Sequence, residues 1–380
     1  MWFLPSASYL PVSAMLRFGL LVVLGLSLTT VAGAKEPDAA QPYAAEKSAA
    51  TTYDIEMVIA VTAPYHTTTL KVWLPLPPSD NVQQVESLGI DTFPTTLAPK
   101  IATEPVYGNR FAYFEFDHPA GAQVIRHRLR ATTHELRWNI DPRQVTTPAR
   151  WPASFAPYLQ SDQAVAINDD VQRELAGIVP HPKNAAADMA LVMRWASDTL
   201  KYDHGKASLA ASSLHAIETK GGHCSDYHGL CSAMGRALGY PTRVTYGLNL
   251  FPKNSPSHCK LEAFLPPYGW VSFDVSETQK LVQAIGKDQQ LSRAERKKLQ
   301  DAAFARLQSG FRDNTWLLQT RGTGYDLAPP AAKKVNVVRT IYAEADGVAL
   351  PDPDPADPKQ RAFAWQVGMK VLSDKARKLP

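Results

Sequence analysis

The stretch that decides the fold is residues 221–247, GGHCSDYHGLCSAMGRALGYPTRVTYG, where a glycine pair precedes a cysteine and a helical pattern. Apolar or soft residues recur every three or four positions, as on one buried helix face: Cys224, Tyr227, Leu230, Cys231, Met234 and Leu238. Gly239 and Pro241 then end the helix, and 243–247 is expected to form a short strand. The pattern therefore places Cys224 in the first helical turn, where the helix dipole and unpaired N–H groups stabilise a thiolate.

Cys224 also has a plainer explanation, because a cysteine on an apolar helix face is usually a buried core residue. The downstream stretch 257–277, SHCKLEAFLPPYGWVSFDVSE, favours a catalytic role for Cys224 instead. It predicts a strand that begins near His258, a tight PPYG turn and a second strand that ends on Asp274. A cysteine, a histidine and a carboxylate in this order can converge as nucleophile, base and orienting acid.

Three motifs follow one another in residues 222–274: G-x-C-x-D-Y-x-x-L, R-A-L-G-Y-P-T-R-V-x-Y-G and H-C-x-x-E-x-x-L-x-x-Y-G-W-V-x-F-D. With a weaker tail, they resemble the transglutaminase-like superfamily, in its secreted bacterial branch of cysteine proteases, over roughly residues 185–345. The resemblance implies an α+β fold with a papain-like catalytic domain, in which the helix that bears the nucleophile packs on an antiparallel sheet. It implies Cys224 as nucleophile, His258 as base and Asp274 as the acid that orients the base.

Two positions depart from the family pattern. Lys260 stands where an aromatic residue is usual, and Val275 replaces the customary proline after the aspartate. Neither change removes a catalytic group, but Lys260 alters the lining of the cleft and so leaves the substrate open.

The chemistry that the resemblance implies is a thioester acyl-enzyme, formed on a peptide or protein substrate without a cofactor or metal. Water as the acceptor gives a cysteine peptidase or amidase. An amine as the acceptor gives a protein-glutamine acyltransferase, and a fold without turnover gives a binding module. The Cys224 N–H is the expected oxyanion donor.

A zinc site is a further alternative, because Cys224, His228 and Cys231 share one helix face. Their spacing is not a usual one for structural zinc, and two helical turns separate the cysteines by roughly 10 Å. Cys259, next to His258 on its strand, is expected to face the opposite side as core. A disulfide between Cys231 and Cys259 stays open.

The N-terminus predicts export. Arg17 precedes the apolar run FGLLVVLGLSLTTVAGA, which ends in the small residues 32–34. We expect a signal peptide over 1–34 with cleavage after Ala34, a periplasmic or secreted product, and contact with the membrane only during export. The formal net charge of +4 is small for 380 residues, and no glycine-rich phosphate loop occurs, so neither nucleic acid nor nucleotide is an expected partner.

The rest of the chain supports a second, smaller domain. Alternating strands rich in Val, Ile, Tyr and Phe predict a small all-β domain before the catalytic one. The expected organisation is a linker at 35–50, the β domain at 51–140, a helical connector at 141–184, the catalytic domain at 185–348, and a Pro-rich spacer and tail at 349–380.

Overall fold

Strand β1 (Glu46–Thr62) shows how the N-terminal part folds, because its buried and part-exposed side chains alternate from Tyr53 to Val61. Such alternation buries one face of an antiparallel sheet. The computed structural model describes residues 36–251, 256–351 and 365–374; the expected signal peptide lies outside them. Residues from Pro37 onward form one compact unit. Among the described residues, no helix is both long and apolar enough to cross a membrane.

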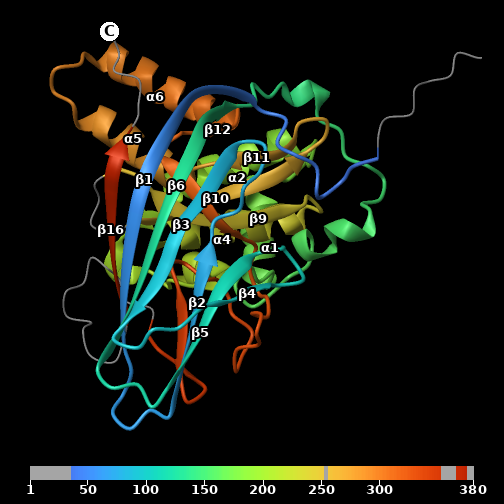
Figure 1. The fold of residues 1–380 in the computed structure, drawn as a ribbon. Coiled ribbons are helices and arrows are strands. Elements are labelled where there is room, and N and C mark those ends of the chain that lie inside the picture. Colours follow the sequence, from blue (N-terminus) through green and yellow to red (C-terminus); the bar gives the residue numbers. More distant parts are fainter. Residues whose placement is uncertain (1–35, 252–255, 352–364, 375–380) are drawn as a thin grey trace, which may run out of the picture. The chain divides into compact units, whose positions relative to one another are not determined.

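Two five-stranded sheets contain the predicted N-terminal strands. In the first, β1 lies between β6 (Ala122–Arg137) and β16 (Trp365–Asp374), and β6 also pairs with β3 (Gln83–Phe93) and β12 (Phe311–Arg312). Figure 1 shows β16, β1, β6 and β3 side by side. The second has the order β15 (Val348–Ala349), β14 (Tyr342–Ala345), β2 (Thr69–Leu76), β5 (Arg110–Asp117) and β4 (Lys100–Thr103).

These sheets also include strands from the far end of the chain. β14 lies in the stretch expected to belong to the catalytic domain, β15 crosses its expected end at 348, and β16 lies in the expected tail. β1 begins at Glu46, within the expected linker. The apolar core between the sheets also takes in Leu248 and Leu317, which lie in a third, four-stranded sheet. The N-terminal strands therefore share their core with the rest of the unit.

The third sheet is antiparallel, with the order β11 (Gly269–Phe273), β10 (Ser257–Leu265), β9 (Thr242–Asn249) and β13 (Trp316–Arg321). A short parallel pair, β7 (Lys201–Tyr202) and β8 (Gly221–Gly222), leads into the central helix α4 (Cys224–Ala237). α4 packs on β9 and β10, as expected of an α+β papain-like domain.

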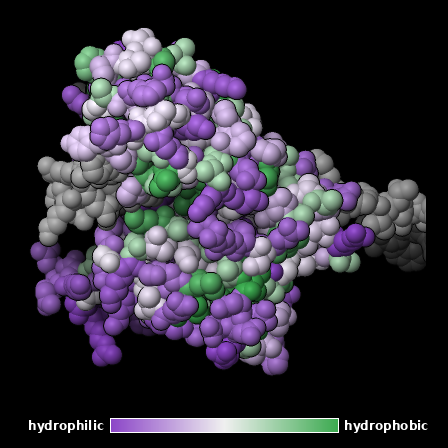
Figure 2. Space-filling view, turned by 90° about the horizontal axis from the view of Figure 1, so that it is seen from below, coloured by the Kyte–Doolittle hydropathy of each residue, from purple (hydrophilic) through white to green (hydrophobic). Residues whose placement is uncertain are grey.

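Four helices pack against α4: α1 (Asp169–Ile178), α2 (Ala185–Thr199), α3 (Ser213–Thr219) and α5 (Val275–Lys287). A further helix, α6 (Arg293–Gln308), packs on α5. Asn168 and Asn184 accept backbone N–H bonds at the starts of α1 and α2, which satisfies donors that a helix leaves unpaired. Short 3₁₀ turns lie at Pro142–Gln144, Ala153–Tyr158 and His204–Lys206. The face of the molecule in Figure 2 is mostly hydrophilic, with its apolar residues in small separate patches.

Candidate active site

Cys224 is the first residue of α4, where the sequence places it, and only 2% of its surface is exposed. The turn before it is fixed by a capping box: the His223 N–H donates to Asp226 Oδ2 (3.0 Å), and the Ser225 N–H donates to His223 Nδ1. Gly222 has φ +133°, and a Cβ there would lie 2.5 Å from Asp226 Oδ2. Asp226 therefore caps the start of α4, and the positive φ of Gly222 provides the tight turn that precedes Cys224.

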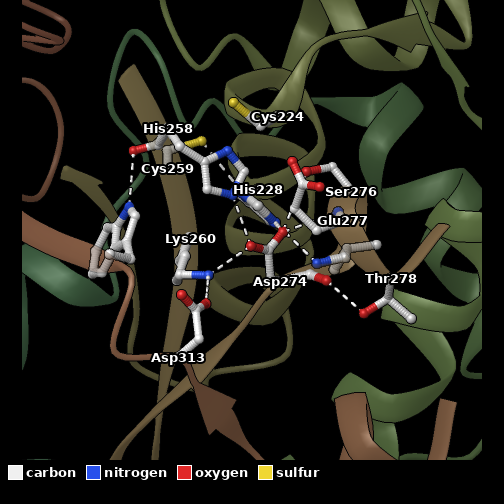
Figure 3. Close-up of polar contacts among 12 residues, drawn as sticks. Cys224, His228, His258, Cys259, Lys260, Asp274, Ser276, Glu277, Thr278 and Asp313 are labelled. Carbon is white, nitrogen blue, oxygen red and sulfur yellow. Dashed lines mark hydrogen bonds and ion pairs between the residues drawn. The ribbon is translucent and has the colours of Figure 1, made fainter. Parts of the chain in front are cut away.

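His258 and Asp274 lie on neighbouring elements, and their side chains are in contact. The β10–β11 register pairs Leu261 with Phe273, which brings the residue after β11 beside the start of β10. His258 Nε2 lies 2.7 Å from Asp274 Oδ2, and Asp274 Oδ1 caps α5 by accepting the Glu277 N–H (3.1 Å). Figure 3 shows His258 between Cys224 and Asp274. Since Nε2 faces the carboxylate, Nδ1 is the ring nitrogen left for the thiol.

Lys260 is a third partner of the carboxylate. Its Nζ lies 2.7 Å from the same Asp274 Oδ2 and 3.6 Å from Asp313 Oδ2, and it lies over the ring of Trp316. Only 3% of Lys260 is exposed. Sequence reasoning noted Lys260 without giving it a role. The available signal was its position two residues after His258, because alternate strand residues point to the same face.

The charges of the three groups support one another. Burial disfavours the Cys224 thiolate, but a hydrogen bond with Cys259 and the charges of His223 and His258 outweigh it, holding the Cys224 pKa well below its usual value. Burial also disfavours the His258 imidazolium, but the charges of Asp274 and Cys224, with a hydrogen bond to each, raise its pKa to about 9. These directions describe a thiolate–imidazolium pair at neutral pH.

Asp274 stays ionised within this cluster. Burial would raise its pKa, but the charges of His258 and Lys260 hold the pKa well below the usual range. A permanently charged carboxylate can orient the imidazole and stabilise its positive charge.

His228 is fully buried and joins three elements rather than lining an open surface. Its Nε2 accepts the Val275 N–H (3.1 Å), so its Nδ1 carries the proton and donates to Cys259 Sγ (3.3 Å). Burial lowers the pKa of His228 to about 4, which keeps the ring neutral. His228 thus ties α4 to β10 and to the start of α5, next to Asp274.

The other two cysteines differ from Cys224. Cys224, Cys231 and Cys259 are all free and buried, so the structure contains no Cys231–Cys259 disulfide. Burial raises the pKa of Cys231 to about 12 and that of Cys259 well above its usual value. Within the described residues, no group of three or more His, Cys, Asp or Glu side chains is placed to hold a metal ion. The activated thiol is therefore Cys224 alone.

Two side chains from other elements, Tyr202 and Lys280, lie near the turn that precedes Cys224. The Tyr202 ring lies 6.1 Å from the His223 ring, and Lys280 Nζ lies 3.9 Å over Tyr202. Lys280 also pairs with Glu277 at 2.9 Å. These residues come from β7, the turn before α4 and α5, and no local sequence pattern indicates that such separated segments meet.

Comparison with known proteins identifies this region. Residues 172–275 match the family model described as transglutaminase-like superfamily. The chain carries a transglutaminase-like domain. Cys224, His258 and Asp274 all lie within the matched residues of that domain.

Two known proteins are similar to this chain at low sequence identity. A solved structure of a candidate cysteine protease from Cytophaga hutchinsonii has a TM-score of 0.57 and 16% identity, covering 87% of this chain and 93% of that chain. An uncharacterised protein of Haemophilus influenzae is 20% identical over 319 residues, covering 75% of this chain and 83% of the relative. The structural match over 87% of this chain shows that its fold also occurs in another solved protein.

Proposed function

We propose that this protein is an exported cysteine hydrolase that cleaves peptide or amide bonds through Cys224, His258 and Asp274. The observation that carries the proposal is the convergence of these residues: an activated thiol at a helix N-terminus, with a buried imidazole between it and a carboxylate at 2.7 Å. A core cysteine would need no such partners, and Cys231 and Cys259 have thiols of raised pKa instead.

In the proposed reaction the Cys224 thiolate attacks the substrate carbonyl, and a C–S bond forms. The Cys224 N–H, which α4 itself leaves unpaired, donates to the oxyanion. The His258 imidazolium gives its proton to the leaving amine as the C–N bond breaks, which leaves a thioester and neutral imidazole. His258 then takes a proton from water, whose oxygen attacks the thioester. The C–S bond breaks, which releases the carboxylic acid and the Cys224 thiolate and leaves His258 as imidazolium.

An amine in place of water would make the same thioester a donor for acyl transfer, so a protein-glutamine acyltransferase is the second candidate. The proposed substrate is a peptide or protein met after export, in the periplasm or outside the cell, which the signal-like N-terminus supports. The likeness to a candidate cysteine protease favours water as the acceptor.

A peptide library incubated with the purified protein tests the proposal. Mass spectrometry should find cleaved peptides, and products carrying an added lysine analogue would indicate acyl transfer instead. Cys224→Ala should abolish both while the protein stays folded, and Cys231→Ser should keep most activity. A thioester on Cys224 should be trapped by acid quenching. Equal loss of activity and stability in the two cysteine variants would point to a structural role.

A further inference from the structure

Cys259 is a buried thiol beside the nucleophile, although it comes from a different element. Cys224 begins α4, Cys259 lies on β10, and α4 packs on β10. The two side chains form a hydrogen bond, and Figure 3 shows both sulfur atoms near the His258 imidazole. Cys259 has no exposed surface, so its thiol can interact only with groups of the protein itself.

His228 sets the direction of this hydrogen bond. Its Nε2 accepts the Val275 N–H (3.1 Å), so its ring proton lies on Nδ1, which donates to Cys259 Sγ (3.3 Å). The Cys259 sulfur therefore accepts from the ring, and its own hydrogen is available for another acceptor. His228 lies four residues after Cys224 in α4, which places both side chains on the same helix face.

The hydrogen bond between the two thiols acts on them in opposite directions. Burial disfavours the Cys224 thiolate, but the bond with Cys259 is among the interactions that hold the Cys224 pKa well below its usual value. Burial raises the pKa of Cys259, and the bond with Cys224 raises it further. Cys259 thus keeps its proton and donates, and Cys224 is the charged acceptor.

We propose that Cys259 is a positioning residue for the nucleophile: its S–H donates to the Cys224 thiolate, and the His228 ring holds the Cys259 sulfur in place. The donors run in one direction, from the Val275 N–H through the ring and the Cys259 thiol to Cys224. Each bond polarises the next, so the chain favours negative charge at its end. The inference rests on the proposed function, because it takes Cys224 as the nucleophile.

Other titratable groups also surround the two thiols, and a change at Cys259 removes none of their charges. They come from α4 and its cap, from β7, β9 and β10, and from the start of α5: His223, Asp226, Tyr202, Tyr246, His258, Asp274 and Glu277. A shift in the titration of Cys224 on removal of the Cys259 thiol therefore reports the contact between the two sulfur atoms.

The pH dependence of Cys224 alkylation tests this role without a substrate. Iodoacetamide reacts with the thiolate, and mass spectrometry locates the label on Cys224. We expect Cys259→Ala to move the acid limb of the alkylation rate to higher pH by about one unit, because the thiolate loses a donor. Cys259→Val, which fills the space without a donor, should give the same shift.

Two further variants serve as controls. Cys259→Ser keeps an O–H donor, so its acid limb should stay closer to the wild-type limb than to that of Cys259→Ala. Cys231→Ala removes another buried thiol, on α4 itself, and should leave the limb unmoved. Urea unfolding shows that the compared variants are folded. A folded Cys259→Ser protein with the same limb as Cys259→Ala contradicts the donor role.

A substitution of His228 tests whether it acts through Cys259. His228→Leu leaves the Cys259 sulfur without its donor and should move the acid limb upward by less than Cys259→Ala does. In the Cys259→Ala protein the same substitution should add nothing, because the contact through which it acts is already lost. An equal further shift in that protein would overturn the chain of bonds.

The role of Cys259 and the proposed function fail in different ways. A low wild-type limb that neither Cys259→Ala nor Cys259→Val moves overturns the role of Cys259 and leaves the proposed function intact. A wild-type limb near that of an ordinary thiol, about pH 8.5, which Cys259→Ala raises further, keeps the contact and overturns the activated thiol on which the proposed function depends.

Discussion

Asp274 holds several groups in place through its two carboxylate oxygens. Oδ2 bonds both His258 and Lys260, and Oδ1 caps α5 through the Glu277 N–H. A carboxylate used on both sides cannot rotate without breaking one of these bonds. The imidazole therefore has its orientation and its tautomer set by a group that is itself fixed.

Replacing Asp274 by Asn tests this role. Asn keeps the size of the side chain but favours the wrong imidazole tautomer and removes the charge that stabilises the imidazolium. We expect kcat to fall by about 10³- to 10⁴-fold with little change in KM, and alkylation of Cys224 near pH 7 to slow. Asp198→Asn, at a surface ion pair with Arg194, should have no effect on either measurement. An active Asp274→Asn enzyme would contradict the assignment.

The raised pKa of His258 predicts how activity depends on pH. Amide hydrolysis needs the imidazolium to protonate the leaving amine, so kcat/KM should fall as the pH rises through about 9. The Cys224 thiolate, whose pKa is low, persists above that pH. Alkylation by iodoacetamide should therefore not fall in the same range. If kcat/KM and the rate of alkylation by iodoacetamide fall together above pH 9, this would contradict a separate role for the imidazolium.

Removing the charge of Lys260 should shift the basic limb of the kcat/KM profile in the direction opposite to that caused by Asp274→Asn. Its ammonium shares Asp274 Oδ2 with His258 and so opposes protonation of the imidazole. Lys260→Met should raise the His258 pKa and move the basic limb of kcat/KM to higher pH. Stability should fall as well, because Asp313 loses its cation. Lys260→Arg keeps the charge and should keep the limb near its original pH, whereas an unmoved limb in Lys260→Met would exclude this electrostatic role.

At the scale of elements, helix α4 depends on a close backbone approach at Gly229. A Cβ there would lie 2.1 Å from the Ala211 carbonyl oxygen, a backbone atom that cannot move freely. Gly229→Ala should lower the free energy of unfolding by about 1–3 kcal/mol. Gly177→Ala in α1, where a Cβ meets no atom within 4 Å, should change it by less than about 1 kcal/mol, towards greater stability. Urea unfolding of the two variants checks the difference, and similar behaviour would contradict the close packing.

Local periodicity predicted the elements better than their partners. The helix at Cys224 and the strand–turn–strand before Asp274 depend on residues close in sequence, and both are present, the second strand ending at Phe273. Alternation says which face of a strand is buried, but it does not say which strand lies beside it. The pairing of 342–345 with β2 could therefore not be predicted. The contact of Lys260 with Asp274 likewise depends on the register of β10 with β11, which alternation does not give.

At the scale of the whole unit, the N-terminal sheets and the third sheet, which carries His258, are joined by packing and by chain crossings. β12 adds to β6, β14 adds to β2, and Leu317 of β13 is fully buried in the core of the N-terminal strands. Separating the sheets would expose that core and the backbone of the paired strands. This argues for one cooperative unit instead of a removable β domain.

Hydrogen exchange under increasing denaturant tests this cooperativity. Amides of β6 and of α4 should exchange through one global opening, with equal free energies. Leu317→Ala removes side-chain volume where the two parts meet, so it should lower both free energies by the same amount, about 2–5 kcal/mol. The exposed Leu299→Ala, on α6, should lower both by much less. If Leu317→Ala lowers the value for β6 while α4 keeps its own, the N-terminal sheets open independently of the helix that bears Cys224.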